Sequence, residues 1–201
     1  MNRFDHRSQK TFKMDVKFGT QLETYFFNNW LNVVEKLGIM KVTDYKNNGC
    51  DNSGEFIPSG NTAGADYRIS GYTIGTNLNI DNEPLEVKWV PTAGKFTLKV
   101  NDVRAYIQEQ ASILFIYNTV KDDVDLKKPK DYNLDTLIGR IKSKAQDIKW
   151  GILWSQNLVR LYRHALDNNM IKPISYMGGK KGFVIQQSDF GKWWNEYDWS
   201  I

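Results

Sequence analysis

Apolar residues in the first third of the chain recur at helical spacing. One face of an α-helix is formed by residues three or four positions apart, and this spacing holds for Leu22, Phe26, Trp30, Val33, Val34 and Leu37. Gly38 follows, and glycine is a typical helix terminator. The pattern predicts a helix over Gln21–Leu37, followed by a polar loop from Asn47 to Gly64.

Two later runs alternate between apolar and polar residues, which is typical of strands with one buried face. These runs are Ala65–Ser70 and Leu85–Val90, and Tyr72–Ile80 is a weaker candidate. Ile113–Asn118 is apolar nearly throughout, as expected of a strand buried on both faces. The sequence therefore predicts a sheet with Ile113–Asn118 near its centre.

The remaining segments predict helices around this sheet. A helix is expected at 101–110, with Asn101 as its N-cap and one face formed by Val103, Tyr106, Ile107 and Gln110. Further helices are expected at about 134–147 and 155–168, then a strand at 182–187 and an aromatic helix from Ser188. This order predicts an α/β fold, in which helices flank a mixed central β-sheet of four or five strands.

Charge is distributed unevenly along the 201 residues. The formal net charge is +4, and residues 1–118 contain 13 Lys/Arg and 13 Asp/Glu. The region from Lys127 to Lys181 contains 12 basic and 4 acidic residues. Such a basic region suits a polyanionic partner, and an ordinary solvated helix surface is an equally good interpretation.

Several classes of protein are disfavoured by composition. No apolar run approaches the roughly 18 residues that a membrane span needs, and Met1–Lys17 lacks the apolar core of a secretory signal. The single cysteine, Cys50, fits a reducing compartment, so a cytoplasmic protein is expected. His6 and His164 are the only histidines, which disfavours zinc chemistry. The segment MGGKKG at 177–182 lacks the Ser/Thr of a phosphate loop and is interpreted as a hairpin turn.

Three charged residues form the candidate site. Glu86 and Lys88 are two positions apart and so share one face of their strand, and Asp66 lies on the preceding candidate strand. Two carboxylates form a hard oxygen site suited to Mg²⁺. Two alternatives remain open: Glu86 and Lys88 as an ion-pair face on a solvated edge strand, and Asp66 as a turn residue after Gly64.

The segments GADYRI and LEVKW, with a helix before them and a helix and buried strand after them, resemble the PD-(D/E)xK nuclease superfamily. The resemblance covers roughly residues 19–118, and Ala65 stands where the family pattern has proline. It implies a restriction-endonuclease-like core at 19–118, preceded by a polar segment at 1–18. Residues 119–201 would form a C-terminal helical and β extension on the same domain, for DNA contact or dimerisation.

The resemblance also implies roles for single residues. Asp66 and Glu86 would be metal ligands together with the backbone carbonyl of Val87, and Lys88 would be the catalytic lysine. Glu23 would add an acid from the first helix, although Thr20 and Glu23 also fit a capping box at a helix start. DNA-backbone contacts are expected from Lys95, Lys99, Arg104 and Gln108.

The function implied is that of a Mg²⁺-dependent DNA endonuclease, restriction-like or from phage or repair, in which Mn²⁺ substitutes for Mg²⁺. Since one such site cuts one strand, double-strand cleavage implies a homodimer. The alternatives are a resolvase of Holliday junctions or other branched DNA, a non-catalytic DNA-binding module, and an interaction protein whose basic region binds an acidic partner.

Overall fold

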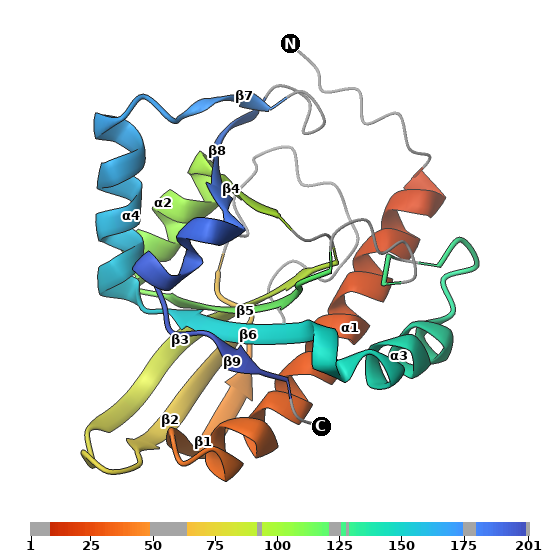
Figure 1. Ribbon diagram of the computed structural model, residues 1–201, viewed down its shortest axis with the longest axis horizontal. Coiled ribbons are helices and arrows are strands. Elements are labelled where there is room, and N and C mark those ends of the chain that lie inside the picture. The colour runs from red at the N-terminus through yellow and green to blue at the C-terminus, as the bar shows by residue number, and fades with distance from the viewer. Residues whose placement is uncertain are drawn as a thin grey trace.

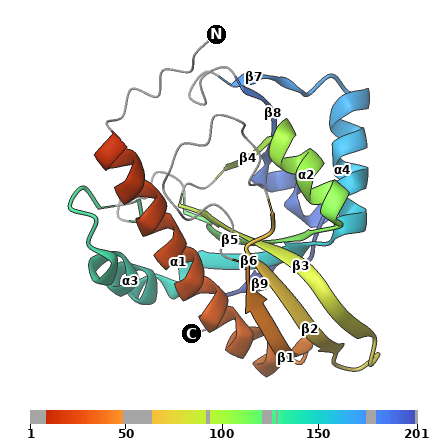
Figure 2. The same ribbon diagram turned by 180° about the vertical axis from the view of Figure 1, so that it is seen from behind.

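The computed structural model describes residues 9–48, 64–91, 94–120, 126–127, 129–174 and 180–199. Its centre is a six-stranded sheet with helices on both faces (Figures 1 and 2). The α-helices are α1 (Gln9–Lys36), α2 (Val100–Glu109), α3 (Leu134–Ser143) and α4 (Ser155–Asp167). Two short 3-10 helices, η1 (Ala145–Asp147) and η3 (Gln187–Lys192), complete the helical part. The structure therefore has the mixed α/β architecture expected from the sequence.

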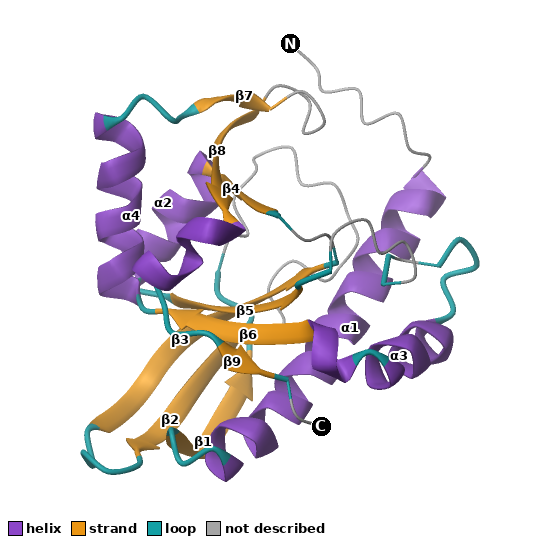
Figure 3. Ribbon diagram, in the orientation of Figure 1, coloured by secondary structure: helices purple, strands orange, loops and turns teal. Residues whose placement is uncertain are grey.

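The strands form one large and one small sheet (Figure 3). The large sheet has the order β1-β2-β3-β5-β6-β9, with bounds Met40–Asn47, Tyr67–Thr73, Asn79–Val90, Ser112–Asn118, Ile148–Leu153 and Tyr197–Asp198. The small sheet has the order β4-β8-β7, with bounds Lys95–Lys99, Lys180–Gln186 and Lys172–Ile174 for β4, β8 and β7.

The large sheet is mixed because β3 and β5 run parallel to each other, while every other pair of adjacent strands in it is antiparallel. A parallel neighbour needs a crossover connection, and here β4 and α2 supply it. At six strands, the sheet exceeds the four or five expected. The two additional edge strands, β1 and β9, carry weak sequence signals.

Each face of the large sheet has its own core. Leu85 and Val87 of β3 pack with Phe26 and Trp30 of α1 on one face, where α3 also lies. On the other face, Ile113 and Phe115 of β5 pack with α2, α4 and the small sheet. The ring centroids of Phe115 and of Phe96 from the small sheet are 4.2 Å apart. All seven residues of β5 are buried, which confirms the expected double-faced central strand.

The first helix is longer than the predicted Gln21–Leu37. It begins at Gln9, so residues assigned to a polar N-terminal segment belong to it. Phe18 explains the extension, because it is buried and packs edge-on against Tyr132 near α3. Thr20 is thus inside the helix, and its hydroxyl donates to the Val16 carbonyl oxygen at 3.1 Å. The capping-box interpretation of Glu23 is therefore wrong.

Three further local predictions are corrected. Strand β1 was missed because most of its side chains are exposed and it forms an edge of the sheet. Asn101 is not the N-cap of α2, since the helix begins at Val100 with Lys99 in the cap position. The helix expected from Ser188 is replaced by η3 and β9, because Trp194 packs into one core and Trp199 into the other.

Some predictions fall where the structure gives no description. Cys50, His6, most of the loop at 47–64 and residues 177–179 of the MGGKKG segment lie outside the described residues. The antiparallel pairing of β7 with β8 on either side of 175–179 has the connectivity of a hairpin. Residues 119–201 contribute β6, which pairs directly with β5 of the expected core.

Candidate active site

Glu86 and Lys88 lie on an interior strand. Strand β5 pairs with β3 at both Glu86 and Lys88, whereas β2 pairs with β3 only as far as Leu85. The solvated edge-strand interpretation is wrong because Glu86 is buried. The Glu86 side chain is 5% exposed and the Lys88 side chain 33%, and the Lys88 ammonium pairs with Glu86 Oε1. Both residues point to the face opposite Leu85 and Val87, as period-two alternation predicts. The pair therefore stands on the side of the sheet that α2 covers.

Tyr106 of α2 is a second partner of Glu86 that sequence reasoning missed. Its buried hydroxyl donates to Glu86 Oε1 at 2.6 Å, and its ring centroid is 5.9 Å from Lys88 Nζ. The sequence placed Tyr106 on the apolar face of its helix. A buried tyrosine hydroxyl usually needs a polar partner, and this was the available signal. The partner itself depends on how α2 packs over β3.

Asp66 reaches β3 from the residue before β2. Its Oδ2 accepts a hydrogen bond from the Val87 amide at 2.9 Å. Its backbone carbonyl accepts from the Asn48 amide at 2.9 Å, and the preceding Ala65 amide donates to Glu109 Oε2 at 3.2 Å. Asp66 forms a bend, and the strand begins one residue later at Tyr67. Both sequence interpretations thus hold in part: Asp66 is a bend residue and also faces the E-x-K strand.

The pKa values of two carboxyl groups near Glu86 are raised at this point. Burial, repulsion from Glu86 and a hydrogen bond to that carboxyl raise the pKa of Asp66 to about 7, against lowering by Lys88 and the Val87 amide. Burial and repulsion from Asp66 and Glu86 raise the pKa of Glu23 on α1 to about 8, again against Lys88. Glu23 is therefore close enough to Asp66 and Glu86 for their charges to raise its pKa. The position of Glu23 in the sequence did not show this proximity.

Lys88 is the cation of this cluster. Desolvation alone would lower its pKa, but the charges of Glu86, Tyr106, Asp66 and Glu23 hold the pKa well above its ordinary value. The lysine is therefore protonated, and a single positive charge faces three carboxyl groups. A cluster with excess carboxyl groups favours either bound protons or an additional cation.

The donor set fits Mg²⁺ as a pair of carboxylates rather than as a complete cage. Among the described residues, no three His, Cys, Asp or Glu side chains lie close enough together to enclose a metal ion. Asp66 and Glu86 are close enough to share a hydrogen bond. Mg²⁺ keeps several waters and is usually held by one or two carboxylates. The carboxylates of Asp66 and Glu86 therefore match the number and type of protein ligands that Mg²⁺ needs.

The expected DNA-contact residues separate into two groups. Lys95 and Lys99 lie on β4, where Lys99 Nζ is 3.3 Å from Asp102 Oδ2. Arg104 and Gln108 are two positions before and after Tyr106 on α2, which places them on the side of the helix away from Glu86. The Arg104 Nε donates to the Tyr162 hydroxyl of α4 at 2.9 Å. The structure therefore places two of these residues on β4 and two on the outer side of α2, and their contact with DNA stays a prediction.

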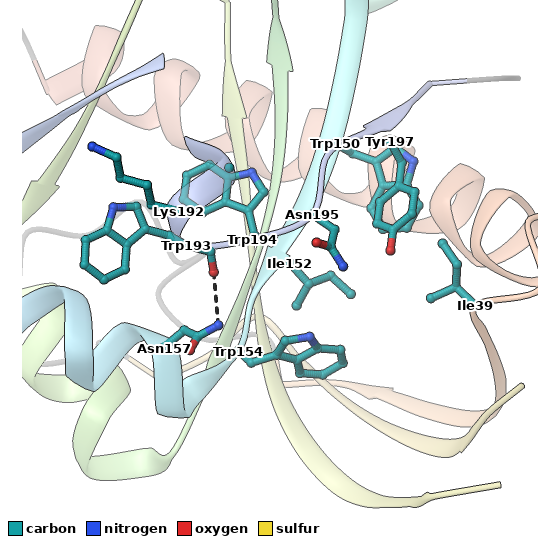
Figure 4. Close-up of a pocket in the computed structure, with 11 residues that line it drawn as sticks. Ile39, Trp150, Ile152, Trp154, Asn157, Lys192, Trp193, Trp194, Asn195 and Tyr197 are labelled. Carbon is teal, nitrogen blue, oxygen red and sulfur yellow. Dashed lines mark hydrogen bonds between the residues drawn. The ribbon is translucent and has the colours of Figure 1, made fainter. Parts of the chain in front are cut away.

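A pocket of about 220 Å³ lies apart from the acidic cluster (Figure 4). It is formed at the end of β6, the start of α4 and the segment after η3, and none of Glu23, Asp66, Glu86 and Lys88 lines it. Its walls are mainly aromatic with two amide side chains: Trp150, Trp154, Trp193, Trp194, Tyr197, Asn157 and Asn195. Because it contains no carboxyl group, it does not share the chemistry of the cluster.

Comparison of the chain with protein-family models, with curated proteins and with solved structures finds no match. Within the part of the chain that the structure describes, no helix has both the length and the apolar character needed to cross a membrane.

Proposed function

We propose that the chain is a Mg²⁺-dependent endonuclease that hydrolyses phosphodiester bonds in DNA. The observation that carries this proposal is the meeting of Glu86 and Lys88 on β3 with Asp66, the residue before β2, whose carboxyl group accepts from the Val87 amide between the other two. Charged side chains are costly to bury without a partner or a function. Glu23 adds a third carboxyl group from α1.

The topology supports a restriction-endonuclease-like core. The order on which the resemblance rests was helix, Asp strand, E-x-K strand, helix and buried strand. The corresponding elements are α1, β2, β3, α2 and β5, with Asp66 immediately before its strand. In addition, β2 and β5 are the two direct neighbours of β3. This arrangement supports the proposal independently of the short motif, which alone has low specificity.

The side chains suit distinct tasks in the proposed reaction. Asp66 and Glu86, together with the Val87 carbonyl, would hold Mg²⁺, which when bound polarises a phosphoryl oxygen and acidifies water. Lys88 would donate hydrogen bonds to the phosphate oxygens, and its positive charge would stabilise the negative charge that develops on them in the transition state. Tyr106 and the Val87 amide fix the Glu86 and Asp66 carboxyl groups through the bonds already described. Glu23 presents a further carboxyl group to the site.

A cleavage assay tests the proposal directly. Plasmid, linear and branched DNA are incubated with the full chain in Mg²⁺, Mn²⁺ or EDTA, beside Asp66→Asn and Asp44→Asn. Asparagine keeps an acceptor for the Val87 amide while removing the charge, and Asp44 is exposed on β1. We expect metal-dependent cleavage by the wild type and Asp44→Asn, and none by Asp66→Asn. Equal cleavage by all three proteins would place any activity elsewhere.

The products separate the remaining alternatives. Discrete bands from plasmid indicate site-specific cutting, and preferential cutting of the branched substrate indicates a resolvase. DNA that is retarded on the gel but not cleaved in any metal would instead favour the non-catalytic DNA-binding module. In such a module Glu86 keeps its contacts with Lys88 and Tyr106. Double-strand cleavage would require two copies of the site, and sedimentation of the DNA-bound chain measures their number.

A further inference from the structure

The small sheet gathers basic residues from two distant parts of the sequence. Strand β4 reads KFTLK, β7 reads KPI and β8 reads KKGFVIQ, so the three strands carry five lysines and no acidic residue. Of these five lysines, Lys95 and Lys99 were among the residues expected from the sequence to contact the DNA backbone. Lys172, Lys180 and Lys181 join them through the pairing of β8 with both β4 and β7.

The strand register places four of these lysines on one face. Directly paired residues point to the same side of a sheet, as do residues two apart along a strand. Gly182 pairs with both Lys99 and Lys172. It follows that the shared face carries Lys95, Lys99, Lys172 and Lys180. We call these four residues the lysine face.

Apart from Lys181, the opposite face of the small sheet is apolar. Phe96 and Leu98 of β4 and Phe183 and Ile185 of β8 are buried in the core between the two sheets. This burial fixes the orientation of the small sheet, because a one-residue slip would turn the apolar side chains outward. Lys95 and Lys172, on the side opposite these apolar residues, are exposed.

The lysine face is large enough to meet several phosphates. Lys95 pairs with Gln186 and Lys172 with Gly182, four positions apart on β8, which is about 13 Å along the strand. Duplex DNA carries one charge per about 1.7 Å of its axis. Lys99 has a surface ion pair with Asp102, and such pairs contribute only about 0–1 kcal/mol. This pair therefore does little to prevent Lys99 from meeting phosphate.

The lysine face is linked in the chain to the acidic cluster. Strand β4 follows β3 after residues 91–94 and leads directly into α2, which brings Tyr106 to Glu86. The small sheet also lies on the side of the large sheet that α2 and α4 cover (Figures 1 and 2). The small sheet thus stands on the side of the large sheet to which Glu86 and Lys88 point.

From these observations we infer that the lysine face binds the sugar-phosphate backbone of DNA. The inference rests on the proposed nuclease function and adds Lys172 and Lys180 of the C-terminal region to the DNA-contact surface. Because lysine contacts to phosphate carry no base information, they would supply affinity and orientation rather than sequence choice. These contacts make the DNA-binding constant fall as the salt concentration rises, since each contact releases counterions from the DNA.

The test compares two double variants of the full chain. Lys95→Gln/Lys172→Gln removes two exposed charges from opposite edges of the lysine face, and Lys36→Gln/Lys46→Gln removes two exposed charges at the end of α1 and on β1. Binding to a labelled 20-base-pair duplex is measured by fluorescence anisotropy in EDTA, from 50 to 300 mM NaCl. The control pair has the same effect on net charge, so any difference between the variants is local.

We expect the slope of log K against log salt to become shallower by about 1.8 in Lys95→Gln/Lys172→Gln, since each lost phosphate contact changes it by about 0.9. Affinity near 100 mM salt should fall at least about tenfold. The control pair should keep the wild-type slope. Equal slopes for the two double variants, with a wild type that binds and cleaves DNA, would overturn the inference alone. A wild type that neither binds nor cleaves would overturn the proposed function as well.

Discussion

The hydroxyl of Tyr106 donates to Glu86 Oε1 at 2.6 Å, so a residue of the crossover helix orients a carboxylate on the central strand. The same oxygen also pairs with the Lys88 ammonium. Glu86 is therefore held from two sides before any ligand binds. Such preorganisation is a common requirement of metal and catalytic sites, because a misplaced carboxylate weakens both binding and rate.

Replacing Tyr106 with phenylalanine tests this orientation. The variant keeps the ring in the core but removes the hydroxyl that donates to Glu86 Oε1, which leaves that oxygen with the Lys88 ammonium. We expect Mn²⁺ affinity and the cleavage rate each to fall roughly 10- to 100-fold, the range typical of residues that orient a ligand. Mn²⁺ binding is measured by electron paramagnetic resonance or calorimetry.

Tyr67→Phe is the matched control for that variant. Tyr67 is also buried, and its hydroxyl donates to the Thr24 hydroxyl rather than to a carboxyl group. This variant should bind Mn²⁺ as the wild type does. An equal loss of affinity in both variants would show a general packing effect instead of a specific one.

Lys88→Ala separates cleavage from DNA binding. It removes the cation that lowers the pKa values of Asp66 and Glu23, so these groups should hold protons to higher pH. We expect the cleavage rate to fall about 10²–10³-fold, the scale of one lost electrostatic stabiliser, with the pH–rate profile displaced upward. DNA retardation should persist. A variant with normal rate and profile would exclude Lys88 from the reaction.

Stability in the absence of metal should depend on pH through the acidic cluster. The pKa values of Asp66 and Glu23 are raised from 3.8 and 4.5 to about 7 and about 8. Between about pH 4.5 and 8 the folded protein holds protons that the unfolded chain has released, so the free energy of unfolding from these groups falls as pH rises.

Urea denaturation in EDTA measures this effect. Wild type should lose stability relative to Glu23→Gln/Asp66→Asn between pH 5 and pH 8.5, because the amides do not ionise. Saturating Mg²⁺ should restore wild-type stability at the higher pH by binding the folded state. A constant difference between the two proteins across this range would show that burial and mutual repulsion do not raise these two pKa values in solution.

Gly71 tests the edge strand that the sequence did not reveal. A Cβ at this position would lie 2.0 Å from the Lys41 carbonyl oxygen of β1, so Gly71→Ala should destabilise the protein by about 1–3 kcal/mol or detach β1. Gly19 lies inside α1 with no atom within 4 Å of its Cβ position. Gly19→Ala should therefore stabilise the protein by up to about 1 kcal/mol. Thermal and urea denaturation measure both changes, and a neutral Gly71→Ala would contradict the β1–β2 pairing.

The sequence alone determined those features in which a local period matches burial. Alternation in 85–90 placed Glu86 and Lys88 on one face of a strand, and the apolar run at 113–118 marked the doubly buried strand. Both follow from side-chain direction along an extended backbone. The E-x-K spacing and the preceding aspartate were visible for the same reason.

Contacts between distant segments were decided only by tertiary structure. The sequence cannot show that α2 turns Tyr106 toward Glu86, that α1 carries Glu23 to Asp66, or that β8 places Lys172 on the same face as Lys99. Nor could it show the length of α1, because Phe18 is buried through its contact with Tyr132. In each case the favourable partner is far away in the chain, and packing rather than local preference determines which side chains meet.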